Sequence, residues 1–180
     1  MKRILSLSLR ALALAFSVSF VACKDSDLKE PVEYTGPLRK IQGVETFYTE
    51  KNMVKVKMVA ADVYEYENGD REFPNGLYIE FFNEFGKLES TLKANRAYFF
   101  KKENQWRGRG KVEVKNIAKN EQLNTEELFW KPAEEKIFTE KFVTIRQEGD
   151  VIYGRGLEAK QDMSEYEIME PTGDFEVKEE

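Results

Sequence analysis

Short runs of alternating apolar and polar residues constrain this chain more than any other feature of its sequence. Four of them are MVKVKMVA (53–60), GLYIEFF (76–82), KVEVKNI (111–117) and FVTIRQ (142–147). A period of two, with many Val, Ile, Tyr and Phe residues, is typical of antiparallel strands that bury one face. Turn-forming residues separate the runs, and the nearest approach to a helical stripe, NTEELFWKPAEEK, is interrupted by Pro132. The sequence therefore predicts an all-β domain.

Two blocks of sequence recur at the same spacing of 31 residues. The segment 92–98 (LKANRAY) aligns with 123–129 (LNTEELF), and Val112-Glu-Val114 aligns with Val143-Thr-Ile145. An earlier copy starts at Met58 and a degenerate later copy covers 157–163. Each copy predicts a pair of strands, stacked as in a β-solenoid or an open jelly roll.

Alternation along these strands places their apolar residues on one shared face. A curved pair of sheets would enclose that face as an apolar trough, and a flatter pair would fill it as an ordinary sandwich core. Both readings stay open at this point. In either case the two ends of the stack expose unpaired strand edges, which can accept a strand from another chain.

The N-terminal segment predicts export and a lipid anchor. Residues 1–22 have a basic start, an apolar stretch and a small-residue end, which is the layout of a secretory signal peptide. Phe20-Val21-Ala22-Cys23 resembles the lipobox of bacterial lipoproteins, which implies lipidation of Cys23; the alternative is a plain signal peptide with an incidental cysteine. We expect residues 23–40 to form a flexible tether and 41–180 the periplasmic domain.

Composition excludes several classes of protein. The chain has no His and a single Cys, which removes the commonest general base, most transition-metal sites and any internal disulfide. We therefore expect no enzyme, metal or cofactor. Without residues 1–22 the chain has 25 Lys and Arg against 33 Asp and Glu, so its net charge is negative. RGRGK (107–111) therefore indicates a bulge or tight bend rather than nucleic-acid binding. Trp106 and Trp130 are expected to pack at strand ends rather than to bind a sugar.

Three segments together resemble a known family. They are GRGKVEV (108–114), LNTEELFW (123–130) and GRGLEAKQDMSEYEI (154–168), and with their order and spacing they resemble LptC, a membrane-anchored component of the lipopolysaccharide exporter. The resemblance covers residues 40–177. The anchor differs, because a transmembrane helix is usual in that family whereas a lipidated cysteine is predicted here.

The resemblance implies a boat-shaped, open and twisted β-jelly-roll of the LptA type. Its apolar groove would shelter the acyl chains of lipopolysaccharide, received from an inner-membrane ABC exporter (LptF/LptG-like) at the N-terminal edge. The C-terminal edge, with Phe175 and Val177, would pass the lipid to an LptA-like bridge protein. The candidate groove residues are Val56, Met58, Ile79, Phe81, Leu92, Ala94, Val112, Val114, Leu123, Val143 and Ile145.

The predicted location is the periplasmic side of the inner membrane. Lys24 follows Cys23, so the aspartate that retains enteric lipoproteins in that membrane is not directly beside the cysteine, and the outer membrane stays open as an alternative. Two other functions stay open as well: an LptA-like periplasmic lipid shuttle, and a glycan-binding outer-membrane lipoprotein.

Overall fold

Strands and one short 3₁₀ helix make up the described part of the computed structural model, residues 33–173. In chain order they are β1 (Arg39–Glu50), β2 (Met53–Glu65), β3 (Arg71–Phe73), β4 (Leu77–Phe82), β5 (Leu88–Ala94), β6 (Arg96–Phe100), β7 (Gln105–Asn116), β8 (Glu121–Lys131), η1 (Pro132–Glu134), β9 (Lys136–Gln147), β10 (Asp150–Lys160) and β11 (Tyr166–Thr172). All of them lie in the unit Gly36–Glu180, one of the two into which the chain divides. The predicted all-β jelly-roll fold is confirmed, and the four alternating runs coincide with β2, β4, β7 and β9.

The strands form one antiparallel meander. β2 pairs with both β3 and β4, so these two are halves of one long strand interrupted at residues 74–76. β7 pairs in the same way with both β5 and β6, which are separated by Asn95. When β3 with β4, and β5 with β6, are each counted as one strand, neighbours in the sheet are also neighbours along the chain, from β1 to β11.

The long strands bend at a common level, which we call the ridge. The pairing register shifts between Arg109 and Val112 in β7 and between Arg155 and Leu157 in β10. Gly110 and Gly156 lie at these shifts, each with φ of 74°, in the left-handed region that favours glycine. RGRGK and YGRGLE are therefore bends, as predicted.

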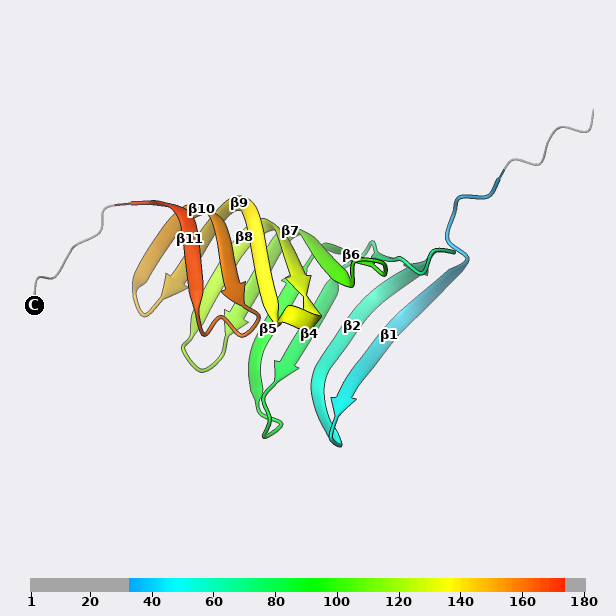
Figure 1. Cartoon of the computed structure of the whole chain (residues 1–180), viewed down its shortest axis with the longest axis horizontal. Coiled ribbons are helices and arrows are strands. Elements are labelled where there is room, and N and C mark those ends of the chain that lie inside the picture. The colour runs from blue at the N-terminus through cyan, green and yellow to red at the C-terminus, as the bar shows by residue number, and fades with distance from the viewer. Residues whose placement is uncertain (1–32, 174–180) are drawn as a thin grey trace, which may run out of the picture. The chain divides into compact units, whose positions relative to one another are not determined.

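The ridge divides the sheet into two walls. The first wall comprises β4, β5 and residues 44–50, 53–60, 112–116, 121–125, 142–147, 150–155 and 170–172; the second comprises β3, β6 and residues 39–42, 62–65, 105–109, 128–131, 136–139, 157–160 and 166–168. In Figure 1 the strands β7 to β10 fold over near the top of the view, so the walls face each other and their free margins form a mouth below. Phe81 of the first wall contacts Trp130 of the second, with ring centroids 5.1 Å apart.

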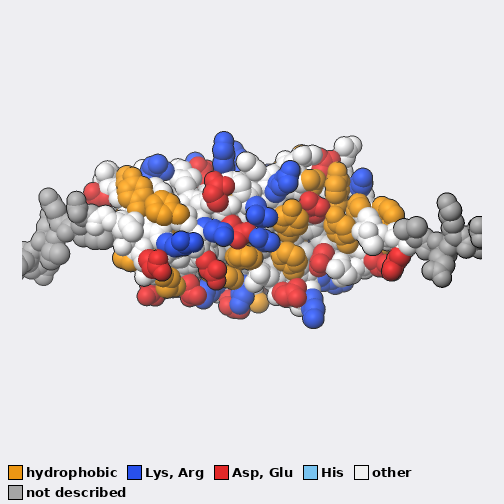
Figure 2. All heavy atoms as spheres, turned by 90° about the horizontal axis from the view of Figure 1, so that it is seen from above, with side chains coloured by type: hydrophobic (Ala, Val, Ile, Leu, Met, Phe, Trp, Pro, Cys, Tyr) orange, Lys and Arg blue, Asp and Glu red, His pale blue; other side chains and the backbone are white. Residues whose placement is uncertain are grey.

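The outer surface of the ridge is mixed in charge. Seen from above in Figure 2, Lys, Arg, Asp and Glu side chains intersperse over the middle of this surface, and hydrophobic side chains gather toward its ends. Glu127 pairs with both Arg107 and Arg109, so the two arginines of RGRGK share one carboxylate within the sheet. This pairing gives no support to a nucleic-acid site.

Candidate binding groove

The inner face of the first wall carries rows of side chains that run across the strands. Residues directly opposite each other in antiparallel strands point to the same face, so the pairing register defines each row. The middle row is Thr46, Met58, Ile79, Leu92, Val114, Leu123, Ile145 and Ile152. The row beside the ridge is Val44, Ala60, Leu77 and Ala94, followed by Val112, Thr125, Val143 and Gly154.

The predicted groove residues all lie in these rows or in the row next to the mouth. All of them except Val56 are buried. Side chains from the second wall, among them Leu128, Ile137 and Leu157, fill the space opposite and join the same apolar cluster. In this conformation the trough is closed by packing, and contact of these residues with lipid stays a prediction.

The row next to the mouth changes character half-way along the sheet. At the N-terminal end it is apolar, with Tyr48 opposite Val56 and Val56 opposite Phe81. It then continues with Ser90, Asn116 and Glu121, which are polar. The mouth therefore has an apolar half and a polar half, which we call the entry half and the latch half.

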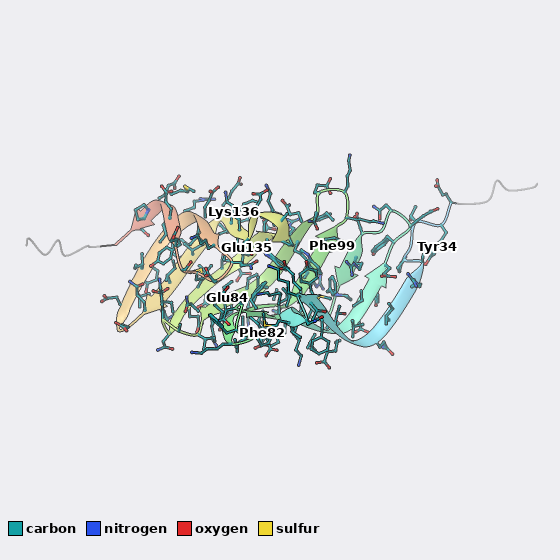
Figure 3. The ribbon with its side chains drawn as sticks, turned by 60° about the horizontal axis from the view of Figure 1, so that its bottom comes forward. Tyr34, Phe82, Glu84, Phe99, Glu135 and Lys136 are labelled. Atoms are coloured by element: carbon teal, nitrogen blue, oxygen red, sulfur yellow. The ribbon has the colours of Figure 1, made fainter. Side chains whose placement is uncertain are left out.

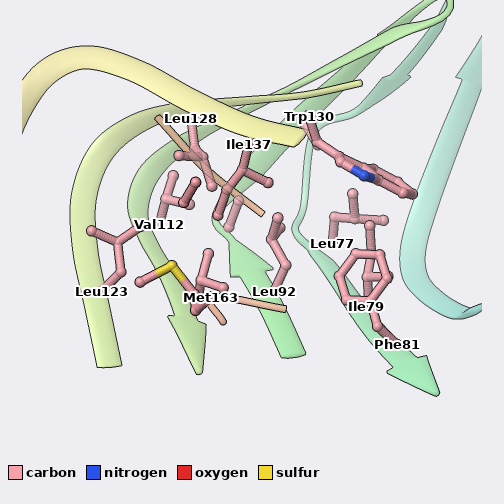
Figure 4. Packing of buried hydrophobic residues seen from close by; sticks show 14 of the residues in the cluster. Leu77, Ile79, Phe81, Leu92, Val112, Leu123, Leu128, Trp130, Ile137 and Met163 are labelled. Atoms are coloured by element: carbon pink, nitrogen blue, oxygen red, sulfur yellow. The ribbon is translucent and has the colours of Figure 1, made fainter. Parts of the chain in front are cut away.

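Aromatic side chains connect the two walls at the boundary between these halves. Trp106 lies between Phe73, Phe99 and Trp130, at centroid distances of 5.3, 4.9 and 5.8 Å. Figure 4 shows Trp130 reaching over Phe81 and Ile79. The guanidinium of Arg71 lies 4.6 Å from the Phe99 ring centroid, a cation–π contact at the partly exposed side of the cluster. The packing predicted for Trp106 and Trp130 is confirmed.

A loop crosses the latch half from the second wall to the first. This loop, residues 161–165 between β10 and β11, is called the strap below. On the second-wall side, Trp130 Nε1 donates a hydrogen bond to Gln161 Oε1 (2.8 Å), and Gln161 N donates to Glu135 O (2.8 Å). On the first-wall side, Ser90 Oγ donates to Gln161 O (3.1 Å) and Asn116 Nδ2 to Asp162 O (2.8 Å). The strap thus joins the two margins of the mouth.

The side chain at the centre of the strap points inward. Met163 is 0% exposed, and Figure 4 shows it lying between Leu92 and Leu123. Beyond the strap, Tyr166 OH donates to Gln147 Oε1 (3.0 Å) and again joins the second wall to the first. The latch half is therefore bridged at two places, by the strap and by Tyr166.

The entry half is uncovered in comparison. β1 pairs only with β2, so its other edge is free among the described residues. Ile41 and Tyr48, which share the inner face of β1, are 40% and 62% exposed. In Figure 3, which turns the mouth toward the viewer, Phe82 and Glu84 lie on one margin and Glu135 and Lys136 on the other.

Carboxylates gather around the strap. Burial, followed by the charges of Asp162 and Glu135, raises the pKa of Glu89 above its ordinary value, and Lys55 opposes the shift. Burial, followed by the charge of Glu121, raises the pKa of Tyr166. Like charges near Glu89 disfavour its ionised form in the closed latch half.

Some predicted sites lie outside the described residues. These are the lipidation site Cys23 and the edge residues Phe175 and Val177. Within residues 33–173 no group of acidic, Cys or His side chains could hold a metal ion. No helix in that range is long and apolar enough to cross a membrane.

The strap was not predicted from the sequence. In the repeat, Met163 of the copy 157–163 corresponds to Tyr98 and Phe129 of the two clearest copies, which predicts that it continues a strand. The available signal was the pair Ser90 and Asn116, which are polar although the neighbouring inward positions of their strands, Leu92 and Val114, are apolar.

Comparison with known proteins gives one match. A protein-family model described as "Lipopolysaccharide-assembly, LptC-related" matches residues 11–172, which is most of the chain. No curated protein matches the chain significantly.

Proposed function

Since this chain belongs to the LptC-related family of lipopolysaccharide-assembly proteins, we propose that the space between its two walls shelters the acyl chains of lipopolysaccharide. Membership implies a role in lipopolysaccharide transport, and the family is one of transport proteins rather than enzymes. The proposal adds a place for the lipid, a direction for its passage and the surfaces that meet other components.

The observation that carries the proposal is the apolar entry half. There, the mouth row (Tyr48, Val56 and Phe81) is continuous with the buried middle row, so an acyl chain could pass from the mouth to the interior over apolar side chains. Each methylene removed from water contributes roughly 0.8 kcal/mol, so a groove of this kind lowers the cost of moving lipid through an aqueous compartment.

We place the chain at the periplasmic side of the inner membrane, held by a lipidated Cys23. The free edge of β1 then docks on an LptF/LptG-like exporter, and the C-terminal edge, including Phe175 and Val177, accepts an LptA-like bridge. Two features support this arrangement: β1 and β11 are the terminal strands of the meander, and each pairs with a single neighbour among the described residues. Strand addition at both edges would make adjoining grooves continuous.

Photocrosslinking at two valines of β2 tests the proposal. Val56 faces the entry half, whereas Val59 pairs with Tyr78 on the outer face. A diazirine amino acid is placed at each position in the full chain, in cells. We expect lipopolysaccharide adducts from position 56 and none from position 59.

Two other labelling patterns would contradict the proposed lipid groove. Equal labelling at both valines would indicate nonspecific contact with a membrane, and labelling from neither would remove the interior as the lipid site. Binding of delipidated oligosaccharide in place of the whole lipid would favour the glycan-binding alternative.

A further inference from the structure

Met163 adopts a backbone conformation that is unusual for its residue type. Its φ is 60°, in the left-handed region that non-glycine residues seldom occupy. Such a conformation persists only where the surroundings hold it, and here the buried side chain and the flanking turn do so. Met163 N donates to Lys160 O (2.9 Å), and Ser164 N donates to Asp162 Oδ1 (2.9 Å).

Three hydrogen bonds from side chains of the first wall and its β7–β8 turn hold the strap in place. They come from Ser90, Asn116 and Lys119, which donate to the backbone carbonyls of Gln161, Asp162 and Ser164. No strand of the first wall pairs with the strap, because the segments that flank it, residues 157–160 of β10 and 166–168 of β11, belong to the second wall. The strap can therefore leave the first wall without breaking the ladder between strands.

Two polar residues beneath the strap hold it, and one of them, Asn116, also accepts a hydrogen bond from Lys119 N (2.8 Å) in the turn after β7. Ser90 and Asn116 are buried on the face that otherwise carries Leu92, Val114 and Leu123. A polar side chain at such a position is unfavourable unless it is hydrogen-bonded, and the strap carbonyls supply acceptors for both. The two buried polar residues therefore lie at the point where the strap contacts the first wall.

We propose that the strap is a displaceable gate in which Met163 holds the place of an acyl chain, closing the latch half until lipid or a partner protein displaces it. This inference rests on the proposed function, because it assigns regulation to the same groove. Met163 is apolar, unbranched and flexible, so it can fill a channel that later admits a hydrocarbon chain. Lipid entering through the entry half would stop at the aromatic cluster while the strap is closed.

The charges around the strap fit a gate that must open. In the closed state Asp162 of the strap and Glu135 of the second wall act as like charges on Glu89 of the first wall. Lys55 opposes them at Glu89, and Lys160 attracts Asp162 and Glu135. Separation of the strap from the first wall relieves the repulsion at Glu89.

A reversible crosslink between the strap and the first wall tests the gate. The full chain carries Asn116→Cys and Asp162→Cys, and the photoreactive residue is placed at position 56 or at position 145. Under oxidising conditions we expect lipopolysaccharide adducts at position 56 to persist and those at position 145 to be lost. Reduction of the same sample should restore the adducts at 145. The controls are the two variants that each carry only one of the introduced cysteines beside Cys23, treated in the same way.

The outcomes separate the gate from the groove. Adducts at position 145 in both the oxidised and the reduced protein would overturn the gate and leave the groove intact. Adducts at neither position after reduction would reject the groove itself.

A second variant covers the case in which the two cysteines do not join. Met163→Ala removes the side chain that fills the channel, so adducts at position 145 should increase relative to the unsubstituted strap. Met53→Ala, at an exposed hairpin end, should leave them unchanged. An unchanged yield at 145 with Met163→Ala would contradict the gate.

Discussion

The entry half and the latch half of the mouth are built from the same row of the same wall, yet they expose opposite surfaces. Tyr48 and Val56 are apolar and accessible, whereas Ser90 and Asn116 are polar and buried under the strap. Polar residues at inward positions of a strand, such as Ser90 and Asn116, can therefore indicate a surface that another segment of the chain covers. Accessible apolar side chains mark the half that is ready for a ligand.

A buried charge gives the sharpest contrast between the two halves. Val114→Asp places a carboxyl in a site that is 0% exposed and should lower the free energy of unfolding by about 4 kcal/mol or more. Tyr48→Asp, in the entry half, should change it by less than about 0.5 kcal/mol. Urea denaturation measures both, and equal effects would show that the halves do not differ in packing.

Truncation of two methionines gives the next largest effect. Met163→Ala should lower the free energy of unfolding by about 2–4 kcal/mol, because it leaves a void between Leu92 and Leu123. Met53→Ala should cost under about 0.5 kcal/mol, since Met53 is exposed at the end of the β1–β2 hairpin. A small cost at Met163 would mean that the strap is already loose in solution.

Removal of a strap anchor should have a smaller effect. Asn116→Ala deletes the donor to Asp162 O and should cost about 1–2 kcal/mol, with faster hydrogen exchange at the Met163 amide. Gln42→Ala removes an exposed hydrogen bond to Asp62 and should leave that exchange rate unchanged. Unchanged exchange in Asn116→Ala would show that this contact does not hold the strap.

The pH dependence of the latch half is the smallest effect expected. Burial and the charges of Asp162 and Glu135 raise the pKa of Glu89, while Lys55 lowers it. Between the ordinary and the raised pKa the folded chain binds more protons than the unfolded chain, so this contribution to stability falls as pH rises through that window. Glu89→Gln should therefore slow opening of the strap at neutral pH and flatten its pH dependence, as measured by hydrogen exchange. Faster opening in this variant would contradict the assigned repulsion.

The rows of the first wall could be predicted from sequence because a period of two fixes which residues share a face. Met58, Leu92 and Leu123 begin equivalent copies of the repeat and occupy one row. The fourth copy was placed wrongly: the residue that pairs with Ile145 in this row is Ile152, not Leu157. In the copy that begins at Ile152, Gly154 and Glu158 stand where the copy that begins at Leu92 has Ala94 and Tyr98. The replacement of Tyr by Glu makes this copy hard to recognise.

The strap could not be predicted in this way, because its position depends on contacts between residues distant in the chain. Ser90 lies 71 residues before its acceptor Gln161, and no local pattern connects them. The left-handed conformation of Met163 also has no signal in the sequence, since Gly or Asn is the usual residue there.

The ridge has a mechanical consequence. At the register shifts near Gly110 and Gly156 the ladder of hydrogen bonds between strands is interrupted at one common level. The sheet therefore behaves as two stiff plates joined along a hinge line, with compliance concentrated at the fold. A change in the angle between the plates would widen or narrow the mouth along its length, so substitutions at the fold would alter the mouth without touching the residues that line it.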